Sequence, residues 1–109
     1  MDVGIVAIVS LYIHPGREEQ FRHFETAAAR IMRRYGGRIE RALTPRSPSS
    51  NHPAPHEIHV VTFPDMAQFA AYRSDADLAE LAPLRQDAIA RTEIVYGDEA
   101  EPYLDDERD

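Results

Sequence analysis

Arg34-Tyr35-Gly36-Gly37-Arg38 separates two parts of this chain that differ in their apolar periodicity. Before it, residues 17–35 repeat apolar side chains at three- and four-residue spacing, which predicts an amphipathic helix packed on a sheet. After it, residues 38–43 predict a short strand, and their charged side chains indicate an edge position. Because two consecutive glycines end a helix sharply, the stretch predicts a tight turn from that helix back onto the sheet.

The segments on either side of this turn have patterns of their own. The first is an uninterrupted β-branched and apolar run, which predicts a central strand covered on both faces. A loop with four prolines follows the edge strand, and a strand, an interrupted helical region and a last strand come after it. In residue numbers we predict a strand at 3–13, a loop at 44–55, and strands at 56–63 and 92–96. Between the last two strands we predict a helical region that begins with Asp65 as N-cap, breaks at Ser74-Asp75 and resumes over about 77–90.

The order strand, helix, strand, strand, helix, strand predicts an α+β fold of the ferredoxin-like βαββαβ type. In this arrangement one four-stranded antiparallel sheet carries both helices on one face. The other face lacks a cover, and an uncovered sheet face normally packs against a partner. We expect one domain over residues 1–97 and an acidic C-terminal tail over residues 98–109.

Composition excludes several kinds of site. The 109 residues include no cysteine and no lysine, which excludes disulfides, thiolate nucleophiles and Schiff-base chemistry. The tail contributes −6 of the net charge of −7, and a nearly neutral body with an acidic tail predicts no binding to nucleic acid. The N-terminus lacks the positive region of a secretory signal, and the apolar run at 3–13 is too short to span a bilayer. We therefore expect no membrane partner and a cytoplasmic location.

Five short motifs follow one another along the chain: LYIHPG (11–16), RYGGR (34–38), VVTFPD (60–65), AAYRSD (70–75) and LAPLR (81–85). The last four, in this order and spacing, resemble the YGGR-bearing family of unknown function within the dimeric α+β barrel superfamily. The first resembles the antibiotic-biosynthesis monooxygenases and related branches of the same superfamily. Together the likeness covers roughly residues 5–97.

The resemblance implies a homodimer whose two sheets pack face to face as a barrel. It also implies a pocket for a small apolar or aromatic ligand between the sheet and the helices of each subunit. The superfamily includes cofactor-free oxygenases, haem-degrading enzymes, lactone isomerases, polyketide cyclases and non-catalytic transcriptional modules, so membership narrows the fold more than the function. We expect a small-molecule-acting enzyme of the cofactor-free oxygenase, isomerase or cyclase type. The alternative is a non-catalytic homodimeric module that binds a ligand or a protein.

Histidine is the natural proton-transfer residue near neutral pH in a chain without cysteine and lysine. His14 ends the first strand two residues after Tyr12, and this pair could orient and deprotonate a phenol-like substrate. Alternatively, His14 only caps the turn that follows. His59 lies mid-strand among apolar residues, so it is either catalytic or a satisfied histidine of the core or the dimer interface. His14, His59 and Tyr12 are the candidate catalytic residues.

Arg38, Tyr72 and Arg85 are the candidate substrate-binding residues, and the two arginines match positions of the family pattern. A guanidinium at the mouth of a pocket could hold a substrate carboxylate or enolate. Tyr72 is expected to pack its ring in the core with its hydroxyl at the pocket edge. The alternative for Arg85 is an ion pair with Glu80 or Asp87.

No pattern in the chain predicts a metal site. His56 and His59 are three residues apart on a predicted strand, so they should point to opposite faces and cannot hold one ion together. A haem would need only one axial histidine, but nothing in the sequence requires it. We therefore expect no metal and no cofactor.

Overall fold

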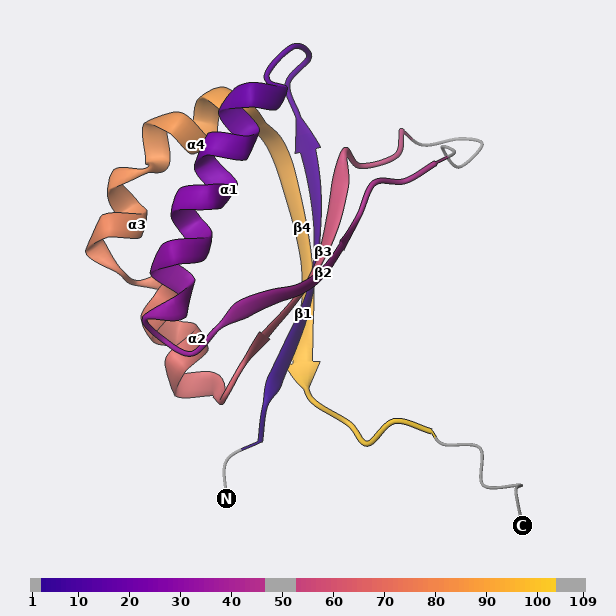
Figure 1. Cartoon of the computed structure of the whole chain (residues 1–109), viewed down its shortest axis with the longest axis vertical. Helices are drawn as coiled ribbons and strands as arrows, with labels where there is room; N and C mark the ends of the chain where they lie inside the picture. Colours follow the sequence, from indigo (N-terminus) through magenta and orange to yellow (C-terminus); the bar gives the residue numbers. More distant parts are fainter. Residues whose placement is uncertain (1–2, 47–52, 104–109) are drawn as a thin grey trace.

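A single sheet organises the computed structural model, which describes residues 3–46 and 53–103 (Figure 1). Its four strands lie in the order β2-β3-β1-β4, and each neighbouring pair is antiparallel. The elements in chain order are β1 (Ile5–Ile13), α1 (Glu18–Arg33), β2 (Arg38–Leu43), β3 (Glu57–Phe63), α2 (Met66–Arg73), α3 (Ala76–Glu80), α4 (Ala82–Ala88) and β4 (Ile89–Asp98). The predicted ferredoxin-like α+β fold is confirmed, with the first strand central and the second at an edge.

The described helices all cover the same face of the sheet (Figure 1). Alternate residues of β1 therefore differ in burial: Ile5, Ala7 and Leu11 lie beneath the helices, whereas Ile8 on the other face is 40% exposed. The expected cover on both faces of β1 is thus present on one face only within the described residues. None of the described helices combines the length and the apolar character needed to cross a membrane.

Gly36 and Gly37 make the predicted turn from α1 to β2 for two different reasons. Gly36 has a φ angle of 73°, in the left-handed region that residues with a side chain rarely adopt. Gly37 lies against the ring of Phe63, where an added Cβ would stand 2.2 Å from the Phe63 Cε2 atom. One glycine is therefore required by backbone conformation and the other by close packing of the turn on β3.

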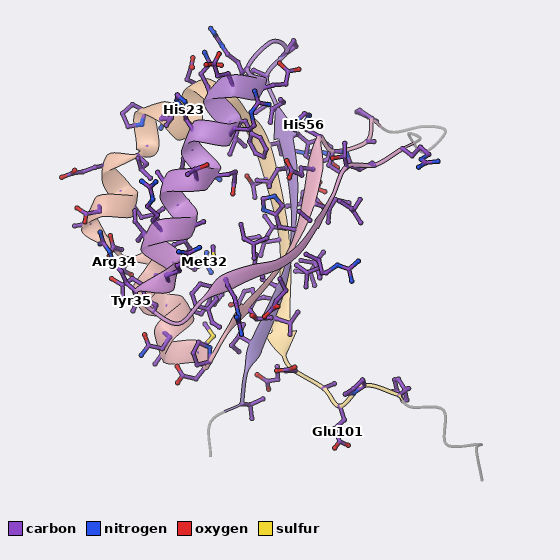
Figure 2. All side chains as sticks on the ribbon, in the orientation of Figure 1. His23, Met32, Arg34, Tyr35, His56 and Glu101 are labelled. Carbon is purple, nitrogen blue, oxygen red and sulfur yellow. The ribbon has the colours of Figure 1, made fainter. Side chains whose placement is uncertain are left out.

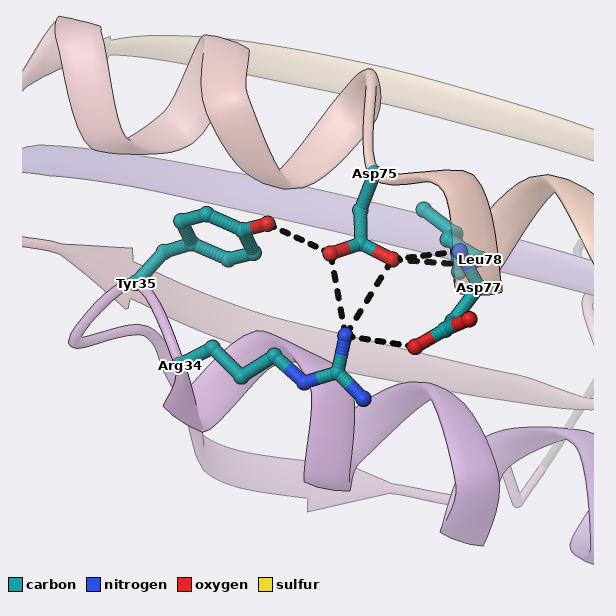
Figure 3. A network of polar contacts seen from close by, with 5 residues as sticks. All are labelled: Arg34, Tyr35, Asp75, Asp77 and Leu78. Carbon is teal, nitrogen blue, oxygen red and sulfur yellow. Dashed lines mark hydrogen bonds and ion pairs between the residues drawn. The ribbon is translucent and has the colours of Figure 1, made fainter.

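The two residues before the glycines tie the end of α1 to the break between α2 and α3 (Figure 3). The Tyr35 hydroxyl donates a hydrogen bond to the Asp75 carboxylate, and Arg34 Nη1 lies 3.1 Å from Asp75 Oδ2 and 2.8 Å from Asp77 Oδ2. Asp75 also caps α3, because it accepts hydrogen bonds from the backbone N–H groups of Asp77 and Leu78. The hydrogen bond from Tyr35, followed by these backbone bonds, lowers the pKa of Asp75. An ionised Asp75 therefore holds α3 in place against the end of α1.

Two boundaries around the last strand differ from the prediction. The helical region does not continue to residue 90: α4 ends at Ala88, and Ile89 already pairs with Ile13 of β1. At its other end β4 extends to Asp98, which pairs with Ile5, so the first residue assigned to the tail belongs to the sheet. Both differences arise because β1 offers hydrogen-bonding partners along its whole length, and this pairing overrides local propensity.

Buried side chains between the helices and the sheet form two clusters. One gathers around Phe63 and Phe69, and the other gathers around Leu11, Phe21 and Ala88. Val9, near the middle of β1, packs against both. Residues of both clusters line a cavity between the helices and the sheet.

Candidate active site

The cavity has a volume of about 430 Å³, within the range of pockets that bind small molecules. Every helix and every strand contributes to its wall, which is mainly apolar. The polar residues that line it are few: Glu25, His59, Tyr72, Arg73, Arg85 and Thr92. The cavity is therefore an apolar space in which a small number of polar groups would determine what binds.

His59 is placed in this cavity by the alternation of β3. His59, Val61 and Phe63 occupy every second position and are all buried toward the helices, with His59 only 4% exposed. The imidazole lies between two carboxylates: Nδ1 is 3.7 Å from Glu25 Oε1, and Nε2 is 3.3 Å from Glu57 Oε2. A histidine in this position can exchange a proton with a carboxylate on either side.

Glu25 extends from α1 toward the same cavity. Burial, and then the neighbouring charge of Glu57, raise the pKa of Glu25 from 4.5 to about 7, although the charge of Arg85 opposes the change. Glu25 is therefore present in both its neutral and its ionised form near neutral pH, which is the property of a general acid or base.

Tyr72 comes from α2 and meets the expectation that its ring packs in the core. Its ring centroid lies 5.4 Å from that of Phe63, and the residue lines the cavity. Burial, and then the charge of Glu25, raise the pKa of Tyr72 to about 12. The hydroxyl therefore remains protonated and can donate a hydrogen bond to a ligand oxygen.

Arg85 reaches the cavity from the exposed surface of α4. Its Nη2 donates a hydrogen bond to Thr92 Oγ1 at 3.0 Å. Among the described residues Arg85 forms no ion pair with Glu80 or Asp87, and Asp87 instead lies 3.6 Å from Arg17 Nε. The alternative of an ion pair with either acid is therefore not observed, and Arg85 lines the cavity.

Tyr12 and His14 do not join this group. The row of β1 that lines the cavity is Ala7, Val9 and Leu11, so Tyr12 lies on the opposite face, where the Arg91 guanidinium stacks on its ring at 4.1 Å. The Tyr12 hydroxyl donates a hydrogen bond to Glu93 at 3.3 Å. His14 lies beyond the last residue of β1 and is exposed. Neither side chain lines the cavity, so the expectation that Tyr12 and His14 act together on a ligand there is corrected.

Arg38 also points away from the cavity. It pairs in register with Thr62 on the open face, and its Nε lies 3.1 Å from Glu40 Oε2. Ile39, the next residue, takes the inward position and lines the cavity. The expectation that Arg38 stands at the ligand side of β2 is corrected, because strand alternation gives that side to its neighbour.

His23 and His56 lie outside the cavity wall. His23 is exposed on α1, and His56, just before β3, meets the ring of Phe21 edge-on with ring centroids 5.3 Å apart (Figure 2). His59 also approaches Phe21, with ring centroids 6.5 Å apart, so the predicted separation of His56 and His59 onto opposite faces is wrong. The reason is that His56 precedes β3 and does not follow its alternation. The described residues contain no group of three His, Asp or Glu side chains that could hold a metal ion.

Glu25 and Glu57 were missed by the sequence reasoning, although the first left a signal. Glu25 follows Phe24 and precedes Ala28 by three residues, so it stands on the buried stripe of the helix. An acid in that stripe requires a partner or a function. Glu57 left no comparable signal, because its role depends on where His59 points.

Comparisons with known proteins show the family and the fold. The model of the family described as Domain of unknown function (DUF1330) matches residues 7–97. None of the curated proteins matches the chain in sequence.

Three solved structures share this fold at low sequence identity. RPA0582 from Rhodopseudomonas palustris, a protein of unknown function, is 16% identical with a TM-score of 0.74, over 94% of this chain and 86% of that chain. SnoaB from Streptomyces nogalater, a cofactor-independent oxygenase, is 14% identical with a TM-score of 0.68, over 94% and 97%. A dabb family protein with a ferredoxin-like fold from Mesorhizobium loti is 16% identical with a TM-score of 0.66, over 92% and 100%. At these identities the likeness concerns the fold alone.

Proposed function

This chain belongs to the DUF1330 family, and on that premise we propose that it is a small enzyme acting on an apolar or aromatic metabolite without a bound metal. The substrate would lie in the cavity between the sheet and the helices. The reaction would be of the cofactor-free oxygenase, isomerase or cyclase type, all of which begin by removing a proton from the substrate. In this proposal the YGGR stretch identifies the branch of the dimeric α+β barrel superfamily to which this chain belongs.

One observation carries the proposal: polar groups from separate elements converge inside an otherwise apolar cavity. His59 comes from β3, Tyr72 from α2 and Arg85 from α4, and all three line the same space. A side chain that can transfer a proton, beside a hydroxyl donor and a guanidinium, suits a substrate that becomes an enolate or a phenolate. A cavity that results only from imperfect packing of the core would not require polar side chains in its wall.

The proposal extends to a homodimer that closes the open face of the sheet. Val60, Ile8 and Val95 are paired in register across β3, β1 and β4 on that face. Val95 is 72% exposed within the single chain. A row of apolar side chains across three strands suits a second copy packed face to face. The same face also supports the alternative function, a non-catalytic homodimeric module.

Anthrone, an apolar aromatic compound with an acidic CH₂ group, provides the test. We expect the full-length protein to bind anthrone and to consume it, with oxygen uptake measured by electrode and products by absorbance. His59→Gln should lower the rate about 100-fold, whereas His23→Gln, on the exposed side of α1, should not change it.

The outcome distinguishes the two functions. Ala79→Trp places a bulky ring at the cavity wall and should abolish both binding and turnover. Unchanged turnover in that variant would refute the cavity as the active site. Binding that Ala79→Trp abolishes, with no turnover of anthrone in the unmodified protein, would favour the non-catalytic module.

A further inference from the structure

Glu25 is the one carboxylate among the described residues that line the cavity. It occupies a position on the buried stripe of α1 where an apolar side chain would stabilise the helix on the sheet, and its side chain is only 19% exposed. Burying a carboxylate costs free energy unless charged or polar groups compensate. A local conflict of this kind is typical of a functional position.

The groups that face Glu25 come from each element packed against it. His59 and Glu57 lie on β3, with the imidazole between the two carboxylates at 3.7 Å and 3.3 Å. The charge of Arg85 on α4 lowers the pKa of Glu25. The charge of Glu25 in turn raises the pKa of Tyr72 on α2. Glu57 therefore orients His59 from outside the cavity wall, and His59 presents its other nitrogen to Glu25.

We propose that Glu25 is the catalytic base and that the substrate is a neutral, apolar carbon acid such as an enolisable ketone. This inference rests on the proposed function and assigns the proton acceptor and the substrate class of the same cavity. A neutral substrate fits because an anionic group beside the ionised carboxylate of Glu25 would be repelled. The apolar wall suits the body of such a molecule, and the Arg85 guanidinium is placed to hold one developing oxyanion.

The reaction that these groups support is an isomerisation. The Glu25 carboxylate accepts the proton from the carbon next to the carbonyl group, and the C–H electron pair forms a carbon–carbon double bond. The carbonyl π pair moves to oxygen, which becomes an enolate opposite Arg85. In a ketone with a β,γ carbon–carbon double bond this enolate is a dienolate, and return of the proton from Glu25 to the γ carbon moves the double bond to the α,β position and restores the carbonyl group. No electrons are gained or lost overall, so no oxidant or reductant is required.

The probe 5-nitrobenzisoxazole tests the base directly. Removal of its C3 proton breaks the N–O bond and releases a coloured phenolate, so the rate is followed by absorbance in the full-length protein. We expect saturable turnover that rises with pH and reaches half its maximum near pH 7, where Glu25 becomes ionised. Glu25→Gln should lower the rate at least 100-fold. Glu19→Gln, an exposed acid on the same helix, should leave it unchanged.

Two further variants distinguish the loss of the catalytic base from a loss of the folded structure. Glu25→Asp keeps the carboxylate on a shorter side chain and should retain part of the rate, with circular dichroism unchanged. His59→Gln should shift the pH midpoint of the remaining activity, because it removes the group between the two carboxylates.

The results separate this inference from the proposed function. If calorimetry shows that the probe binds and that Ala79→Trp abolishes binding, while Glu25→Gln keeps the full rate, the assignment of Glu25 is wrong and the cavity proposal stands. A pH midpoint near 4.5 would also overturn the assignment. If the probe does not bind any variant, the proposed function fails together with this inference.

Discussion

Replacing Glu25 with glutamine should make the protein more stable at high pH and should flatten its pH dependence. In the folded protein Glu25 keeps its proton up to about pH 7, whereas the unfolded chain releases it near pH 4.5. Between these values the folded state binds more protons than the unfolded state, so the free energy of unfolding decreases as pH rises. Below pH 4.5 this contribution is constant, and well above pH 7 the full penalty is present.

The size of the effect follows from the two pKa values. One pKa unit corresponds to about 1.4 kcal/mol, so the difference between 4.5 and about 7 is worth roughly 3 kcal/mol. The Glu25 side chain is 19% exposed, so solvent screens it only in part and the figure is an upper value. With a urea dependence of about 2 kcal/mol per molar, the unfolding midpoints of the two proteins should diverge by roughly 1.5 M between pH 4.5 and pH 8.

The assay is urea unfolding followed by circular dichroism at one fixed protein concentration, because dimerisation would otherwise shift the midpoint. Other titrating groups are common to both proteins and cancel in the difference between them. Glu19→Gln serves as the matched control and should show the same pH dependence as the unmodified chain. A constant difference between Glu25→Gln and the unmodified protein across this pH range would refute the reasoning that burial raises the pKa of Glu25 to about 7.

Three other outcomes are expected. Gly37→Ala should destabilise the fold by about 1–3 kcal/mol in urea unfolding, because its Cβ would overlap a neighbouring ring, whereas Gly97→Ala should have little effect because no atom lies within 4 Å of its Cβ. Light scattering should give a dimeric mass for the unmodified chain and a monomeric mass for Val95→Arg; a monomeric unmodified chain at micromolar concentration would contradict the dimer. Asp75→Ala should lower the melting temperature and speed hydrogen exchange of the Leu78 amide, since that amide loses its hydrogen-bond acceptor; unchanged exchange would show that the cap does not hold α3.

The elements of the fold were accessible from sequence because they depend on neighbours along the chain. The apolar spacing of α1, the N-cap Asp65 and the break before Asp75 are local features, and each was found where it was predicted. The Gly36-Gly37 turn was likewise predicted from backbone properties. The end of α4 and the full length of β4 were not, because pairing with β1 decides them.

The candidate site was only partly accessible. His59 and Tyr72 were named from their residue types and do line the cavity, and Arg85 reaches it as well. Tyr12 and Arg38 were named too, but both lie on the opposite face. A strand presents successive side chains to opposite faces, so a choice between two neighbouring positions decides whether a residue faces the cavity or the open face of the sheet.

The sequence by itself determined the order of the elements and the turn at the double glycine. These follow from periodicity and backbone sterics, which act over a few residues. Only the tertiary structure brought Glu25, His59 and Arg85 to one cavity, because they come from a helix, a strand and another helix that are distant in the chain. The raised pKa of Glu25 depends on that burial and on the charge of Glu57. A property created by neighbours in space has no counterpart in the order of residues.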